Sequence, residues 1–103
     1  MNKYEVMYIV KPLEDEAFEA VVKKFEDLVK NNRGTVEKID RWGKKRFAYE
    51  IQKLYEGLYV VMNFSADAAC VAELDRVMKI TDELLRHMIV RKTEKRSEEK
   101  KDE

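Results

Sequence analysis

Cysteine is almost absent from this sequence, since Cys70 is its single example. One thiol cannot form a disulfide within the chain, which fits a reducing compartment such as the cytosol. Histidine is equally scarce, and His87 together with Cys70 cannot supply the four ligands of a structural zinc ion. The sequence therefore excludes small domains that depend on disulfides or zinc for stability.

Long apolar runs are also missing. No stretch reaches the roughly 18 apolar residues that cross a membrane as a helix. The first residues have no long apolar core and no small-residue cleavage site, so we expect neither a signal peptide nor a membrane span. The expected location is the cytoplasm.

An excess of charge of one sign is lacking too, because 21 lysines and arginines balance 21 aspartates and glutamates. A neutral chain has no overall attraction for nucleic acid or membranes, so polyanion binding would require local clustering of cations. The three glycines are isolated at positions 34, 43 and 57, which excludes a glycine-rich phosphate loop.

Candidate catalytic residues are few. His87 lies in a predicted strand without a candidate nucleophile, so we interpret it as a structural histidine. Cys70 lies at the start of a predicted helix with no histidine near it in sequence, which indicates a packed thiol rather than a nucleophile. We predict that the chain is not an enzyme and holds no cofactor or metal.

What the sequence does contain is a clear order of strands and helices. Its 103 residues, 45% hydrophobic and 41% charged, suffice for one domain with one core. Alternating β-branched and aromatic residues predict strands, and apolar residues at helical spacing predict helices. The predicted strands cover 3–10, 35–51, 58–64 and 84–92, and the helices run from 12–16 to about 31 and over 68–79.

This βαββαβ order predicts an α+β, ferredoxin-like split βαβ fold over residues 1–92. Right-handed crossovers then give a four-stranded antiparallel sheet in the order 4-1-3-2, with both helices on one face. The open face and the edge formed by strand two could each recruit a partner. The predicted residues of the open face are Met7, Ile9, Tyr59 and Val61.

Two further segments complete the prediction. Residues 52–57 are expected to form a polar turn that joins strands two and three as a hairpin. Residues 93–103 contain no apolar side chain, so we expect a charged, disordered C-terminal tail.

The most distinctive segment is the basic stretch at residues 41–46. Cations neutralise phosphates, an aromatic face can stack a base, and glycine lets the backbone bend close to a ligand. A bulge near Arg41–Gly43 would also explain why Val36 and Ile39 break the strand alternation. A solvated strand end is an equally good interpretation of composition alone. The candidate RNA or partner contacts here are Arg41, Trp42, Lys44, Lys45 and Arg46.

Further cations gather near strand ends. Each alone is a typical solvated surface charge, but as a set they could follow a phosphate backbone. The predicted strand 58–64 lacks the basic start and the paired exposed aromatics of the RNA-recognition motif, which argues against base-specific binding across the sheet. These additional candidates are Lys3, Arg86, Arg91 and Lys92.

Segments 4–12, 41–51 and 84–92 resemble the bacterial small-ribosomal-subunit protein six family, and the middle segment is the most specific. The resemblance extends to about Lys92, although the family often has proline where this chain has Glu50. It implies a non-catalytic, cytoplasmic ribosomal protein that binds the central domain of small-subunit ribosomal RNA. It also implies a heterodimer with small-subunit protein eighteen.

Two other functions remain open at this point. One is a ferredoxin-like regulatory or interaction domain that dimerises through its open sheet without RNA. The other is a small hydrolase of the acylphosphatase type, although fold analogy alone does not supply a catalytic site. RNA affinity that falls with salt would favour the ribosomal function over both.

Overall fold

The computed structural model describes residues 2–92 of the chain. The elements follow the predicted order, which is therefore confirmed. They are β1 (Asn2–Val10), α1 (Asp15–Asn31), β2 (Thr35–Ile51), β3 (Leu54–Ala66), α2 (Ala68–Lys79) and β4 (Leu84–Lys92). The tail predicted at 93–103 lies outside the described residues.

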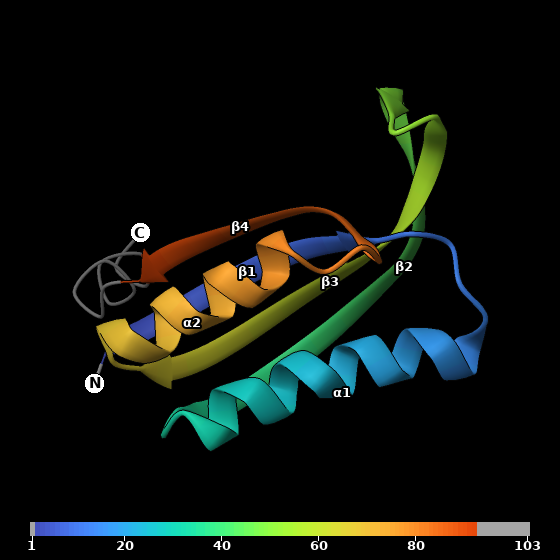
Figure 1. Cartoon of the computed structure of the whole chain (residues 1–103). Helices are drawn as coiled ribbons and strands as arrows, with labels where there is room; N and C mark the ends of the chain where they lie inside the picture. The colour runs from blue at the N-terminus through green and yellow to red at the C-terminus, as the bar shows by residue number, and fades with distance from the viewer. Residues whose placement is uncertain (1, 93–103) are drawn as a thin grey trace, which may run out of the picture.

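One antiparallel sheet carries the fold. Its strand order is β2-β3-β1-β4, which confirms the predicted order read from the opposite edge. Both helices cover the same face of the sheet, as the ferredoxin-like arrangement requires (Figure 1). β2 and β4 are the two edge strands.

The core lies between this face and the helices. The buried residues of α1 recur every three or four positions, as the sequence predicts. Asp67 caps the N-terminus of α2, because its side chain accepts a hydrogen bond from the backbone N–H of Cys70 at 3.0 Å. Each large apolar side chain buried here contributes about 1.5–3 kcal/mol. The main contributors from the helices are Phe18, Val21, Val22, Phe25, Val29, Cys70, Leu74 and Met78.

The connection between β2 and β3 is shorter than predicted. A two-residue turn at Gln52 and Lys53, with φ values of 51° and 66°, replaces the expected turn over 52–57. Such left-handed turns match the twist of the strands, but they usually contain asparagine or glycine. Neither residue occurs at positions 52 and 53, so the sequence did not predict this turn. Because β1 pairs with β3 only from Leu58 onward, the tips of β2 and β3 project beyond the sheet as a two-stranded hairpin (Figure 1).

β2 is irregular along its length. Its register against β3 shifts at Val36/Lys38, at Arg41/Gly43 and at Arg46/Ile51. The second shift is the predicted bulge. Gly43 there has a backbone φ of 87°, which residues with a Cβ atom rarely adopt. This edge strand therefore bends where its basic residues lie.

The open face contains the predicted residues, but two of them are covered. Met7 lies opposite Val61, and Ile9 lies opposite Tyr59, so the four share one face. Ile9 is only 8% exposed and Val61 only 3% exposed, because neighbouring side chains of adjacent strands cover them. The prediction that they form an exposed surface is wrong, since alternation identifies the face but not how tightly its side chains pack.

Candidate nucleic-acid and protein interface

The predicted interface residues do not form one cluster. The largest group belongs to β2, at its central bulge and in the hairpin that projects from the sheet. A second group belongs to β4 and the start of β1. The β2 group is Arg41, Trp42, Lys44, Lys45 and Arg46, and the second group is Lys3, Arg86, Arg91 and Lys92.

The hairpin presents cations at its base and its tip. Lys44, Lys45 and Arg46 are exposed, and within residues 2–92 none has a carboxylate oxygen within 4 Å of its charged nitrogens. Lys53 in the turn is a further exposed cation, and it is absent from the predicted contacts because a longer loop was expected there. Positive charge on a projecting hairpin suits contact with phosphates.

Trp42 lies at the bulge next to these cations. It is 51% exposed, and it has no residue directly opposite on β3, because the register shift leaves it unpaired. The Nζ atom of Lys45 lies 5.9 Å from the centroid of the indole ring. A cation–π contact of this kind contributes about 0.5–1 kcal/mol at an exposed site. The ring is therefore oriented while its surface stays available to a base or to an apolar side chain.

Arg41 differs from its neighbours because it is already paired. Its Nε and Nη2 atoms each donate a hydrogen bond of 2.8 Å to the carboxylate of Glu19 on α1. These hydrogen bonds lower the pKa of Glu19 and raise the pKa of Arg41. Arg41 thus connects the bulge of β2 to α1, and its charge is compensated before any partner binds.

The second group lies mostly at the far end of the sheet. Lys3 and Lys92 are directly opposite on the open face, where Lys92 Nζ lies 3.1 Å from Asn63 Oδ1. Arg91 alternates to the helix side and donates to Asn2 Oδ1 at 3.2 Å. Arg91 and Lys92 are adjacent in sequence but therefore lie on opposite faces of the sheet.

Arg86 is separate from the β2 group and from the other three cations of the second group. It lies opposite Ile9, and the same cross-strand row continues through Tyr59 to Gly43 on the other edge. Three strand spacings of about 4.8 Å place Arg86 about 14 Å from the bulge. A single extended ligand on the open face could span this row, but one phosphate could not.

His87 and Cys70 both make contacts within the fold. His87 Nε2 lies 2.7 Å from Asp75 Oδ1, and Lys79 Nζ lies 3.1 Å from the other carboxylate oxygen. Hydrogen bonds, first from His87 and then from Lys79, lower the pKa of Asp75. The Cys70 thiol is buried, and burial raises its pKa, which disfavours the nucleophilic thiolate.

Residues 2–92 contain no group of three or more histidine, cysteine, aspartate or glutamate side chains placed to hold a metal ion. In the same range neither helix combines the length and the apolarity needed to cross a membrane.

Known proteins that resemble this chain agree in family. The family model described as ribosomal protein S6 matches residues 3–91. Small ribosomal subunit protein bS6 of Desulforamulus reducens is 54% identical over 95 residues, which cover 91% of this chain and 100% of that protein. The bS6 protein of Carboxydothermus hydrogenoformans is 51% identical over 92 residues, covering 88% and 96% of the two chains.

Solved structures give the same result. The crystal structure of 30S ribosomal protein S6 from Thermotoga maritima matches with a TM-score of 0.88 at 31% identity, covering 98% of this chain and 96% of that one. The solution structure of the C-terminal domain of MgtC from Mycobacterium tuberculosis matches with a TM-score of 0.58 at 11% identity and shares the fold alone. The chain therefore belongs to the ribosomal protein S6 family, as the resemblance of segments 4–12, 41–51 and 84–92 indicated, and is a protein of the small ribosomal subunit.

Proposed function

We propose that this ribosomal protein binds the central domain of small-subunit ribosomal RNA as a heterodimer with small-subunit protein eighteen. The cationic hairpin is the observation that carries the proposal. Lys44, Lys45 and Arg46 are exposed and free of carboxylate partners within residues 2–92, and Trp42 stands beside them. Phosphate neutralisation by such cations is the main source of affinity for RNA.

Protein recognition is the second part of the proposal. The net charge of zero means that this chain contributes little long-range attraction to RNA, and a cationic partner would supply the phosphate contacts that it lacks. Arg41 and Trp42 suit a shared surface, because one is a charge-compensated side chain and the other offers an apolar ring. We expect both residues to contact the partner as well as RNA.

Family membership locates the chain in the ribosome, in the cytoplasm. The family consists of structural ribosomal proteins, which are generally not enzymes. These relatives favour the ribosomal function over a free regulatory domain and over a hydrolase of the acylphosphatase type.

The test is to measure binding of the chain to a central-domain RNA fragment, with and without protein eighteen, over a series of salt concentrations. We expect the partner to strengthen RNA binding and the affinity to fall linearly on a logarithmic salt scale. RNA binding that is unaffected by the partner would contradict the heterodimer, and absence of RNA binding in both conditions would contradict the proposal as a whole.

A further inference from the structure

The outer edge of β4 is a second surface with the properties of a binding site. β4 pairs with β1 from Lys3–Lys92 to Ile9–Arg86 without a register shift, and no described strand lies on its other side. Regular edge strands expose backbone N–H and C=O groups that can pair with a further strand. β2, with its three register shifts, offers no such continuous ladder.

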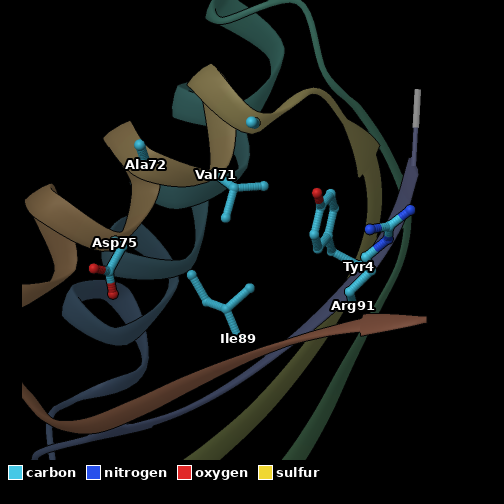
Figure 2. A pocket seen from close by; sticks show the side chains of 7 residues that line it. Tyr4, Val71, Ala72, Asp75, Ile89 and Arg91 are labelled. Carbon is cyan, nitrogen blue, oxygen red and sulfur yellow. The ribbon is translucent and has the colours of Figure 1, made fainter.

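A hollow lies beside this edge on the helix-covered side. It has a volume of about 460 Å³ and is formed by α2 together with β1 and β4. Ala68 and Ala72 are four residues apart on α2 and lie on the same face of the helix. Their short side chains leave space there, which forms part of the hollow. Figure 2 shows Val71 and Ile89 approaching each other in the middle of the hollow, with Asp75 at one end and Tyr4 and Arg91 at the other.

The open side of the same edge is apolar as well. Met88 is 57% exposed and Val90 is 46% exposed, which is unusual for alternate positions of an unpaired edge strand. A smaller hollow of about 290 Å³ lies beside Met88 and is lined also by Met7, Ile9 and Arg86. Side chains of an added strand would stand about 5 Å from those of β4 and would find apolar surface on both faces.

Charge indicates what the edge accepts. Cations stand at both ends of β4, Arg86 at one and Arg91 with Lys92 at the other, and the strand contains no acidic residue. Within residues 2–92, Arg86 and Arg91 have no carboxylate oxygen within 4 Å. The nearby carboxylate of Asp75 is bound by His87 and Lys79. A segment with an apolar middle and acidic ends therefore complements this edge.

The other candidate occupants fit less well. A second copy of β4 would double the cations along the edge and add no acidic residue to balance them. RNA would satisfy the cations, but it would leave the apolar hollows and the backbone edge unused.

We propose that the outer edge of β4 binds an extended, acidic-ended peptide segment of another protein, which joins the sheet as a fifth strand. Its apolar side chains enter the hollow between α2 and β4 on one side and contact Met88 and Val90 on the other. This site is separate from the hairpin and does not depend on RNA binding there.

The probe is a blocked nine-residue peptide with two glutamates at each end and five valines between them, so that apolar side chains face both sides of the added strand. We expect saturable binding with slowed amide hydrogen exchange confined to β4, and much weaker binding of the same peptide with lysines in place of the glutamates. Binding should fall by about tenfold in Ala72→Gln, which fills the hollow, and be unchanged in Ala69→Gln, an exposed alanine outside it.

Charge is tested by the double variant Arg86→Gln with Arg91→Gln, against Lys23→Gln with Arg76→Gln as the control. The first should weaken peptide binding by about tenfold and the second should not. Equal binding of the two peptides, insensitivity to Ala72→Gln, or self-association through β4 would each overturn the proposal. So would protection of β4 by RNA instead of peptide. RNA binding of the Ala72→Gln variant, which keeps every candidate RNA contact, reports separately on the hairpin.

Discussion

The two edges of the sheet carry similar charge but present it differently. β2 bulges repeatedly, bends at Gly43, and ends in a projecting hairpin whose cations have no carboxylate partner among residues 2–92. β4 is short and pairs regularly from Arg86 to Lys92, and its cations flank an apolar middle. An irregular edge cannot offer a continuous hydrogen-bond ladder but can present side chains in several directions, whereas a regular edge can accept a strand.

Each edge is also tied to a helix by one carboxylate. Glu19 of α1 holds Arg41 of β2, and Asp75 of α2 holds His87 of β4. The two edges therefore share a means of attachment while they differ in the surface they expose. Positive charge at a sheet edge therefore does not by itself identify a nucleic-acid site, because backbone regularity and ion pairing decide its use.

The largest expected effect comes from removing the hairpin cations. Replacing Lys44, Lys45 and Arg46 together by alanine should weaken binding to the central-domain RNA, with protein eighteen present, by roughly a hundredfold at about 0.1 M salt. The slope of affinity against salt should also fall by about one for each lost phosphate contact. Filter binding over a salt series measures both quantities.

The matched control replaces Lys23, Lys30 and Lys79, which are exposed lysines paired with carboxylates four residues away on the helices. Equal losses of affinity in the two triple variants would show that the hairpin has no special role and would remove the contrast between the edges.

Trp42→Ala should have the next largest effect. Loss of the exposed ring should weaken the RNA-bound heterodimer by about tenfold, in the range found for stacked aromatic side chains. Tyr49→Ala is the control, because Tyr49 is another exposed aromatic residue on the same strand, outside the basic stretch. Unchanged affinity for both the partner and RNA would exclude Trp42 from the interface.

Gly43→Ala tests the irregularity of β2 directly. Space is available for a Cβ, but the φ of 87° is unfavourable for alanine, so the free energy of unfolding should fall by about 1–2 kcal/mol. Gly43→Asn should cost less, since asparagine tolerates positive φ. Urea denaturation measures both, and equal stability of wild type and Gly43→Ala would mean that the bulge does not require glycine.

The smallest effects should come from the two carboxylates that tie the edges to the helices. Hydrogen bonds lower the pKa values of Glu19 and Asp75, so the unfolded chain takes up protons at higher pH than the folded chain. Their contribution to stability is therefore present above the ordinary carboxyl pKa and is lost as pH falls through the lowered values.

Glu19→Gln and Asp75→Asn should each reduce the free energy of unfolding at pH 7 by less than about 1 kcal/mol, because both pairs are partly exposed. The difference from wild type should shrink toward pH 2, and thermal denaturation over pH 2–7 measures it. A difference that persists unchanged at pH 2 would assign the effect to packing instead of charge.

Much of the fold follows from local sequence. The spacing of Phe18, Val21, Val22 and Phe25 predicts the buried face of α1, and the break between Val36 and Ile39 predicts an irregular β2. The turn at Gln52 and Lys53 escaped prediction because neither residue is typical of left-handed turns. Local patterns thus located the strands well and the hairpin turn poorly.

The binding surfaces were less accessible to prediction. The exposure of Ile9 and Val61 depends on side chains from neighbouring strands, and the hollow beside β4 depends on two alanines of α2. Composition and local patterns predict neither the covering of these side chains nor the hollow, because each requires residues distant in the chain to lie side by side.

The sequence by itself determined the order of the elements, the absence of an internal disulfide, the overall neutrality and the concentration of cations at residues 41–46. These properties follow from local periodicity and composition. Tertiary structure alone decided which cations are available, since Arg41 meets a carboxylate 22 positions away. It also decided that the two cationic edges differ, because backbone register and side-chain covering arise only when the strands pair and the helices pack.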